Sequence, residues 1–237
     1  MPAAAASARA LLDEGRLDEA IEALGAELRD DPGDVRARTF LFELLCFAGQ
    51  YDRAEKQLDV VARGSREAEL GALLYRSALH AERTRQELFA SGSPPPAEDG
   101  RPVAGRLNGR PFSSITDADP RLGARLELFA AGQYTWIPFA QLAAVRVEAP
   151  SRLRDLLWAP ARVQAADGYP GAEMGEVLIP ALSPLSWRHA DGEVRLGRVT
   201  DWDEAAAAPV GQKLLLVDGE PVPILDVREL EIDPPPA

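Results

Sequence analysis

The sequence predicts an α+β protein with helical repeats in residues 1–90, a Pro/Gly-rich linker in residues 91–108 and a β-rich domain in residues 109–237. Three observations predict this organisation. Apolar residues recur at helical spacing in the first part, and Gly49 follows Gly15 there by 34 residues, which indicates a repeat. Beyond the linker the apolar runs are short and lie between turn residues. Such runs are typical of a mainly antiparallel sheet, open or barrel-like.

The first expected helix covers residues 17–29. Its apolar stripe consists of Leu17, Ile21, Leu24 and Leu28. In the segment DDPGD, Pro32 disfavours helix at the residue before it and Gly33 tolerates left-handed backbone, so the helix should end there. Asp34 is then the expected N-cap of the next helix.

Three further helices are expected, in residues 35–49, 51–61 and 67–90. The last carries an apolar stripe of Leu70, Leu73, Leu74, Ala78 and Ala81. The 34-residue period and the pattern Ala20-x3-Leu24…Pro32 resemble the tetratricopeptide (TPR) helix-turn-helix repeat. We therefore expect two TPR-like units and a closing helix, with every apolar stripe in the core. Because so few repeats are marginal alone, the helical part should dock on the β-rich part.

In a TPR-like arrangement the inner helix of the second unit has a polar face towards the concave surface. Arg36, Thr39 and Glu43 lie on that face, and we take them as candidate partner-binding residues. The alternative, that they form an ordinary solvated helix face, stays open.

The β-rich part should contain two hairpins. One covers residues 125–139 and turns at Gly132, and the other covers residues 212–227 and turns at Asp218-Gly219. Further strands are expected in residues 143–149, 175–182 and 193–202.

Two local features complete the expected β-rich part. A short helix should begin at Ser151 as its N-cap and break at Pro160. Asp191-Gly192 should form a turn before the strand at residues 193–202.

The charge of the chain narrows the classes of partner. There are 26 basic and 38 acidic residues, for a formal charge of −12, and no Lys/Arg cluster. Nucleic acid and anionic membranes both require a basic surface, so neither is an expected partner. A single cysteine, Cys46, and an N-terminus without a signal-peptide pattern favour the cytoplasm. No apolar run approaches the roughly 20 residues of a membrane span.

Residues with catalytic potential are few and scattered. Cys46 has apolar neighbours and should be a buried, inert thiol. The only histidines, His80 and His189, are too far apart in sequence to suggest a zinc site. Two carboxylate pairs are more simply explained as turn formers: Asp117 with Asp119, and Asp201 with Asp203. We therefore expect no catalytic residue, no cofactor and no metal.

All four tryptophans lie in the β-rich part. Trp136 and Trp158 are embedded in apolar sequence and should be core residues. Trp187 and Trp202 lack such neighbours, so we add them to the candidate partner-binding residues, because tryptophan is enriched at interfaces.

Four C-terminal segments, taken in order, resemble the ImpE/SciE/TagJ family of type VI secretion accessory proteins: DADPRLGARLELFAAGQYTWIPF, RLRDLLWAPARV, GEVLIPAL and GRVTDW. The resemblance extends over essentially the whole chain. It implies a cytoplasmic, non-enzymatic accessory protein that binds a helix of the small contractile-sheath subunit. It also implies a link to sheath disassembly by an AAA+ ATPase.

Three hypotheses follow from the sequence. The first is an adaptor that captures a sheath helix, in keeping with the TPR-like part and the acidic charge. The second is a hydrolase that uses Asp201, Asp203 or His189 in a cleft of the β-rich part. The third is a purely structural subunit that brings assemblies together.

Overall fold

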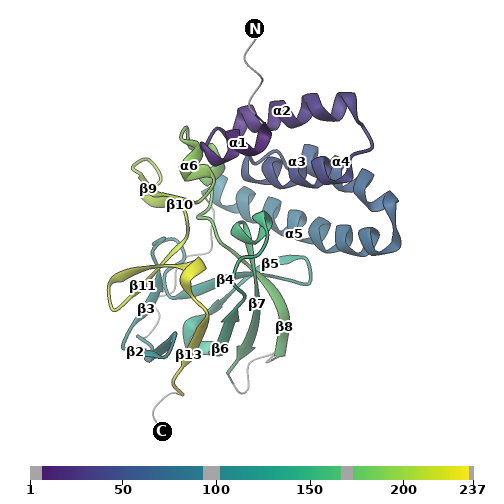
Figure 1. Cartoon of the computed structure of the whole chain (residues 1–237). Helices are drawn as coiled ribbons and strands as arrows, with labels where there is room; N and C mark the ends of the chain where they lie inside the picture. Colours follow the sequence, from purple (N-terminus) through teal and green to yellow (C-terminus); the bar gives the residue numbers. More distant parts are fainter. Residues whose placement is uncertain (1–6, 93–101, 167–172, 235–237) are drawn as a thin grey trace.

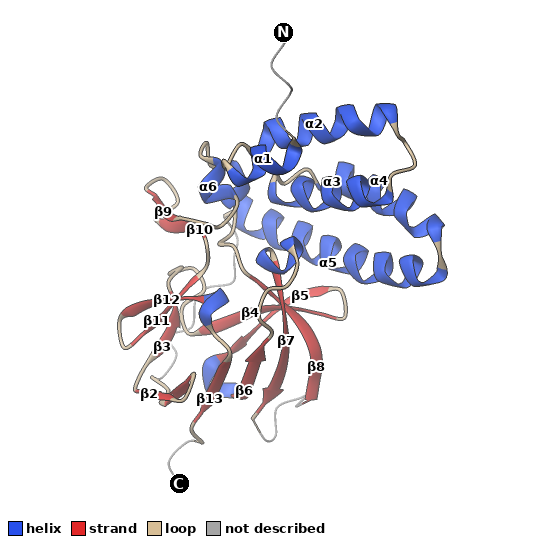
Figure 2. Cartoon of the chain, viewed as in Figure 1, coloured by secondary structure: helices blue, strands red, loops and turns tan. Residues whose placement is uncertain are grey.

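The protein consists of a helical layer stacked on a layer of β-strands (Figure 1). The structure is a computed structural model and describes residues 7–92, 102–166 and 173–234. Within these ranges helices α1 to α5 fill the N-terminal part and all described strands lie beyond it (Figure 2). The α+β fold expected from the sequence is therefore confirmed.

The helical layer contains five helices, two antiparallel pairs and a long closing helix: α1 (Ala8–Asp13), α2 (Leu17–Asp30), α3 (Val35–Phe47), α4 (Tyr51–Val61) and α5 (Arg66–Ala90). The expected helices from α2 to α5 are all present, and α1 adds a short helix before them. Asp34 caps α3 as expected, because its side chain accepts hydrogen bonds from the backbone N–H groups of Arg36 and Ala37.

Gly49 shows why small residues recur in the repeat. It has a φ of +67°, a backbone conformation that favours glycine. A Cβ at this position would lie 2.5 Å from the ring of Trp187, which belongs to the β-rich part. The turn between α3 and α4 is therefore also a contact between the two layers.

The main sheet has eight antiparallel strands in the order β2-β1-β13-β6-β7-β8-β4-β5. Strands β2 and β5 are its edges, so the sheet is open rather than a closed barrel. Its strands are β1 (Gly105–Leu107), β2 (Arg110–Phe112), β4 (Arg125–Ala130), β5 (Gln133–Pro138), β6 (Leu142–Val147), β7 (Trp158–Ala165), β8 (Glu173–Pro180) and β13 (Glu229–Ile232).

Two small sheets flank the main one. One has the order β12-β11-β3 and the other pairs β10 with β9. Their strands are β3 (Ile115–Asp117), β9 (Thr200–Asp203), β10 (Ala208–Gly211), β11 (Leu214–Val217) and β12 (Glu220–Pro223). Both expected hairpins are present: β4 pairs with β5, and β11 pairs with β12 across Asp218-Gly219.

Some expected elements are wrong. The helix expected to run to Pro160 is only a 3-10 turn at Leu153–Leu156, and Pro160 lies inside β7. Strand β7 tolerates this proline because Pro160 lies at the end of the β6–β7 ladder, next to the last residue pair, Val147 with Ala161. The carbonyl of Pro160 still accepts from the N–H of Glu148 at 2.8 Å.

The strand expected at residues 193–202 is mostly absent. Asp191 does not form a hairpin turn but caps a short helix, α6 (Gly192–Arg195), by accepting from the N–H of Glu193. Strand β13 had no sequence prediction. Strand β1 begins inside the stretch expected as linker, and residues 93–101 of that stretch lie outside the described residues.

Two hydrophobic clusters hold the molecule together. One lies within the sheets. The other joins the helices to the β-rich part through five buried residues of that part: Phe129, Leu157, Trp158, Leu182 and Leu196. The expectation that the helical part docks on the β-rich part is confirmed, as is the core position of Trp158, which is 2% exposed. Trp136 is only half-buried.

Candidate functional site

Helix α5 is long enough that one half packs on the β-rich part while the other half extends away from it. Its C-terminal half lies on the β-rich part, and there Glu82, Arg85 and Gln86 are buried. Its N-terminal half extends beyond that contact (Figure 1). The helix therefore contributes to a buried junction at one end and to an open face at the other.

The junction contains a buried cluster of five charged side chains from α5, β3, β4 and the residue before β11. Arg85 donates through Nε and Nη2 to the two oxygens of Glu127, at 2.8 and 2.9 Å. Lys213 Nζ lies 2.6 Å from Glu127 and 2.5 Å from Asp117. Glu82 completes the cluster through Arg85 Nη1 at 3.1 Å. Three carboxylates thus face two cations.

The carboxylates of the cluster differ in acidity. Burial would raise the pKa of Glu127, but Arg85 and Lys213 outweigh it and hold that pKa well below its usual range. Burial raises the pKa of Asp117 to about 6, because Lys213 offsets burial only in part and the charge of Glu127 adds to it. One carboxylate of the cluster therefore titrates near neutral pH.

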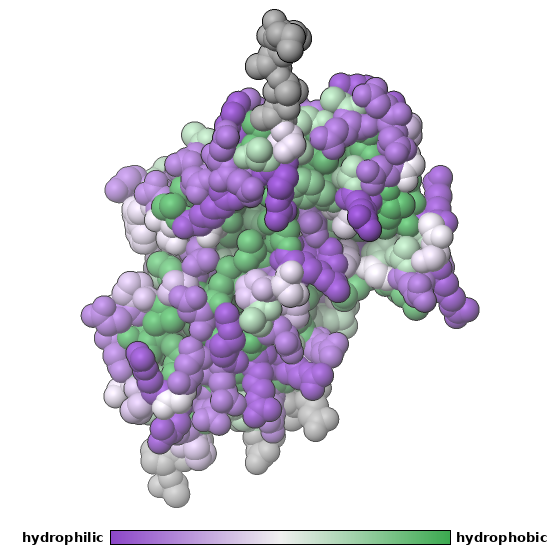
Figure 3. All heavy atoms as spheres, in the orientation of Figure 1, coloured by the Kyte–Doolittle hydropathy of each residue, from purple (hydrophilic) through white to green (hydrophobic). Residues whose placement is uncertain are grey.

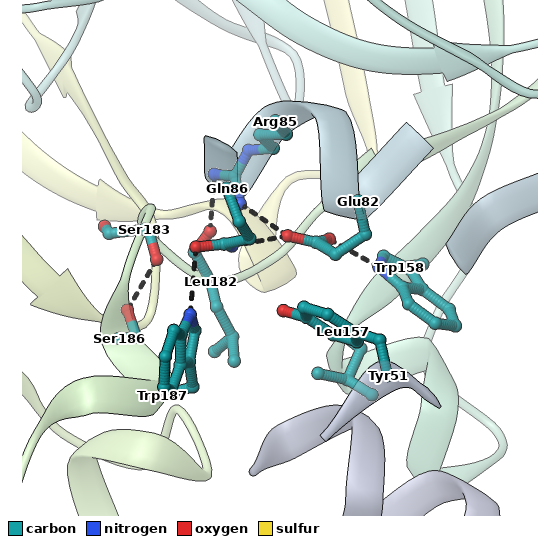
Figure 4. Close-up of a pocket in the computed structure, with 10 residues that line it drawn as sticks. All are labelled: Tyr51, Glu82, Arg85, Gln86, Leu157, Trp158, Leu182, Ser183, Ser186 and Trp187. Carbon is teal, nitrogen blue, oxygen red and sulfur yellow. Dashed lines mark hydrogen bonds and ion pairs between the residues drawn. The ribbon is translucent and has the colours of Figure 1, made fainter. Parts of the chain in front are cut away.

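A small cavity lies beside this cluster (Figure 4). Its volume is about 20 Å³, which is room for about one water molecule. Trp158 Nε1 donates to Glu82 at 2.8 Å, and Gln86 Oε1 accepts from Trp187 Nε1 at 3.2 Å and from the N–H of Leu185 at 2.9 Å. The cavity is too small for a substrate. The hydrogen bonds and ion pairs around it hold the helical layer against the sheet layer.

A second polar contact holds the helical and sheet layers together near the 3-10 turn at Leu153–Leu156. Arg154 donates to Glu43 on α3 at 2.7 Å and to the hydroxyl of Tyr75 on α5 at 2.6 Å. Glu43 is 8% exposed. The expectation that Glu43 lies open on a concave surface is therefore wrong, because the β-rich part covers that end of α3.

The other candidate partner-binding residues are divided between α3, which carries Arg36 and Thr39, and the β-rich part, which carries the two tryptophans. Arg36 is exposed on α3, and the hydroxyl of Thr39 bonds back to the carbonyl of Val35. Trp187 is half-buried against Gly49 at the junction. Trp202 is 48% exposed on β9, far along the chain from the helical face. The structure does not bring these four residues into one surface.

The residues of the hydrolase hypothesis lie at the β9–β10 hairpin. His189 Nε2 is 3.4 Å from Asp201. Asp203 accepts from the N–H groups of Ala205 and Ala206, as a turn former does. The open hollow beside Trp202 has a volume of about 600 Å³, and its described lining contains no serine, threonine or cysteine. The groups beside His189 in this lining that could take part in catalysis are the carboxylates of Asp203 and Glu204.

Other reactive groups are also inside. Cys46 is buried, and burial raises the pKa of its thiol well above the usual value. Asp119 is buried in an ion pair with Arg121 at 2.6 Å. Within residues 7–92, 102–166 and 173–234 no group of three or more His, Cys, Asp or Glu side chains could hold a metal ion. In the same ranges no helix is long and apolar enough to cross a membrane.

The open face of α5 differs from the sequence prediction. Leu70, Leu73 and Leu74 were expected in the core, but they are 62%, 59% and 52% exposed. They are adjacent on one helical face, and we call them the leucine ridge. Scattered single apolar residues on a surface are ordinary, whereas three adjacent large ones are typical of an interaction site. Figure 3 shows apolar surface between the helical and sheet layers.

Two hollows border the leucine ridge. The first lies towards α4 and is lined by Asp59, Ala62, Arg63, Ser65, Arg66, Glu69, Leu70, Leu73 and Arg76. The second lies towards the sheet, has a volume of about 380 Å³ and is mostly apolar. Its described lining joins Leu74, Tyr75, Ser77 and Ala78 of α5 to Phe129, Ala131, Gly132, Glu148, Pro160, Ala161, Arg162, Glu176, Val177 and Leu178. Leu70 and Leu73 line the first hollow and Leu74 lines the second, and we call the ridge with its two hollows the groove on α5.

Comparisons with known proteins agree with this architecture. The sequence model of the tetratricopeptide repeat matches residues 11–76, and that of the ImpE protein family matches residues 109–231. The chain is 37% identical over 261 aligned positions to the type VI secretion system accessory component TagJ of Pseudomonas aeruginosa. That alignment covers 96% of this chain and 91% of TagJ.

A solved structure has the same fold. The crystal structure of protein VPA1032 from Vibrio parahaemolyticus superimposes with a TM-score of 0.83 at 25% sequence identity. The match covers 95% of this chain and 97% of that one.

TPR-like helices joined by buried ion pairs to an antiparallel β domain define the class: a two-layer, repeat-containing α+β protein. Within that class, the match to the family and the identity to TagJ show the relationship directly. The chain belongs to the ImpE family of type VI secretion accessory proteins, which confirms the resemblance found in the sequence.

Proposed function

We propose that this protein is a non-enzymatic, cytoplasmic adaptor of a type VI secretion system that binds a helix of the small contractile-sheath subunit. Through this contact it would modulate sheath assembly or recycling, together with the AAA+ ATPase that disassembles the sheath. Membership of the ImpE family and the identity to TagJ support the assignment to type VI secretion. The leucine ridge supports the binding of a helix.

The leucine ridge is the observation that carries the proposal. Residues three and four apart on a helix are neighbours, so Leu70, Leu73 and Leu74 form a continuous apolar strip. An amphipathic helix that packs along this strip would remove all three leucines from water. Burying a leucine side chain completely is worth about 1.5–3 kcal/mol, so half-exposed leucines supply about 1 kcal/mol each.

The sheet side gives the docked helix a second wall. Phe129 and Leu178 lie in the second hollow, opposite Leu74. Gly132 brings the β4–β5 turn close to α5, since a Cβ there would lie 3.1 Å from Cβ of Ser77. A helix held between a helix and a sheet turn is the usual helix-in-groove mode of recognition.

Titration of a peptide that covers a helix of the small sheath subunit tests the proposal directly. Calorimetry should give a Kd below about 100 μM, which corresponds to about −5.5 kcal/mol. Leu73→Gln together with Leu74→Gln should weaken binding at least tenfold, because about 2 kcal/mol of apolar burial is lost. Glutamine keeps the helix propensity of leucine nearly unchanged.

The matched control is Val35→Gln. Val35 is also a half-exposed apolar residue, at 49%, but it lies at the start of α3. Binding by this variant should equal that of the parent protein. No binding of any sheath helix by the parent protein would refute the adaptor function, and equal binding by the leucine variant would refute the position of the groove.

A further inference from the structure

We propose that the groove on α5 selects a charge-polarised helix, with acidic side chains at one end and basic side chains at the other. This inference rests on the proposed function, because it concerns the helix that we place on the leucine ridge. Three observations support it: an excess of positive charge at the N-terminal end of the groove, an excess of negative charge at the other end, and the distance between them.

The N-terminal end of the groove carries more arginines than carboxylates. Arg63, Arg66 and Arg76 line the first hollow together with Asp59 and Glu69. Arg76 is already neutralised by Asp59 at 2.8 Å. Arg63 and Arg66 are exposed and have no hydrogen bond or ion pair with any residue that the structure describes. With Arg76 and Asp59 paired, Arg63 and Arg66 face the single carboxylate of Glu69, so the lining of this hollow keeps an excess of one positive charge.

The sheet end of the groove has the opposite excess. Glu148, Arg162 and Glu176 line the second hollow. Arg162 pairs with Glu176 at 3.3 Å, which leaves the exposed carboxylate of Glu148. A basic side chain on the docked helix would therefore find a partner at this end.

The two ends are far enough apart to be recognised separately. From Arg66 to Ala78, helix α5 advances by about 18 Å. The Debye length at physiological ionic strength is about 8 Å, so each end of a docked helix interacts mainly with the end of the groove that it covers. Exposed ion pairs add little affinity, but they determine orientation and choice of partner. The leucine ridge therefore supplies affinity and the charged ends supply selectivity.

Three synthetic helical peptides with one common leucine stripe provide the test. Each has about 18 residues, or about 27 Å of helix, which spans both ends of the groove. The polarised peptide has Glu at one end and Lys at the other, the second has Glu at both ends, and the third has Lys at both ends. At about 0.15 M salt the polarised peptide should bind about fivefold more tightly than either of the others.

The third peptide is the critical comparison. If only the overall field of an acidic protein mattered, the all-Lys peptide would bind best. That ranking on the parent protein would overturn the inference. Arg63→Gln with Arg66→Gln should remove the preference for the polarised peptide. The control, Arg29→Gln with Arg110→Gln, changes two exposed arginines on α2 and β2 and should leave the preference unchanged.

The outcomes separate this inference from the proposed function. A sheath helix that binds and depends on Leu73 and Leu74, together with an all-Lys peptide that binds best, would refute only the charge selection. If neither the sheath helix nor any of the three peptides binds, the adaptor function itself is refuted. Loss of the preference in the Arg29 and Arg110 control would show that the overall charge of the protein sets the preference, and it would overturn charge selection by the groove.

Discussion

At the scale of single residues, two arginines on α5 show how burial changes the value of an ion pair. Arg85 is 1% exposed and pairs with Glu127 and Glu82. Arg83, two positions earlier, pairs with Asp52 and Glu55 at the surface. The partners of Arg85 are buried, so water cannot take its place. The partners of Arg83 are exposed, so water can solvate them if Arg83 is lost.

The substitution Arg85→Leu should destabilise the protein by about 3–5 kcal/mol. It leaves three buried carboxylates, those of Glu82, Asp117 and Glu127, with Lys213 as the one remaining cation of the cluster. The hydrogen bond to the carbonyl of Leu182 is also lost. Urea unfolding followed by circular dichroism measures this change. Arg83→Leu is the matched control and should cost no more than about 1 kcal/mol. Equal costs for the two variants would contradict a buried cluster at the junction.

Asp117 should make the stability of the protein depend on pH. Its pKa is about 6 in the folded protein and 3.8 in the unfolded chain, so the folded state binds the proton more tightly. A group of this kind contributes stability that is complete below about pH 4 and is lost as the pH rises through 6. The facing groups Glu127 and Lys213 stay charged in this window, since the pKa of Glu127 is lowered and that of Lys213 is raised.

The substitution Asp117→Asn isolates this contribution. Between pH 5 and pH 7 the parent protein should lose about 1 kcal/mol of unfolding free energy relative to the variant. Urea midpoints of both proteins at the two pH values give the difference. Curves that stay parallel from pH 5 to pH 7 would show that Asp117 remains ionised throughout.

The buried charge cluster also shows which contacts between residues could be predicted from the sequence. Asp117 and Asp119 fit a turn, and Asp119 does cap the backbone of Arg121. Asp117, however, also meets Lys213, which is 96 positions away and lies in a stretch that predicts only a strand. Glu127 likewise lies in a segment whose sequence pattern predicts only a strand of a hairpin. No local pattern marks these three residues as neighbours, because the cluster is created by strand order.

At the scale of elements, the turn between α3 and α4 couples local backbone geometry to the packing of the two layers. Gly49→Ala should destabilise the protein by about 2 kcal/mol or more, because alanine is strained at a positive φ and its Cβ would meet the ring of Trp187 at 2.5 Å. Thermal unfolding of the variant measures the loss.

Gly25→Ala is the matched control for Gly49→Ala. Gly25 lies inside α2 with no atom within 4 Å of a Cβ built there. Alanine at this position should stabilise the protein by about 0.5–1 kcal/mol through its higher helix propensity. A gain at both glycines would mean that the turn at Gly49 does not need left-handed backbone.

Elements with a strong internal period could be predicted, and elements shaped by their neighbours could not. Helices α2 to α5 and both hairpins follow from apolar spacing and turn residues. The segment at residues 192–195 alternates like a strand, yet Asp191 caps it as a helix that lies against α2, where Arg195 pairs with Asp18 at 2.7 Å. Periodicity also cannot tell which apolar stripe will be covered, so the leucine ridge was assigned to the core.

At the scale of the whole molecule, the helical and sheet layers share one core and one set of buried charges. The hydrophobic cluster of the helices includes Phe129, Trp158 and Leu182 from the β-rich part. The cation of Arg85 is neutralised mainly across the junction, by Glu127. Each layer covers part of the apolar core of the other. We therefore expect the full chain to unfold in one cooperative transition.

The isolated helical part, residues 1–92, should therefore fail to fold. Without the sheet it would expose the faces that pack on Trp158 and Leu157, and it would leave Arg85 with only Glu82 as a partner. Two and a half repeats provide too few neighbours to replace that loss. Circular dichroism should show low helicity and no cooperative urea transition.

Replacing Arg85 and Glu82 in the fragment by leucine removes the unpaired charges. A cooperative transition in this variant alone would show that charge, rather than lost apolar contact, prevents folding. A cooperative transition in the unmodified fragment would show instead that the repeats fold as an independent domain. The sheet would then serve only to support the groove on α5.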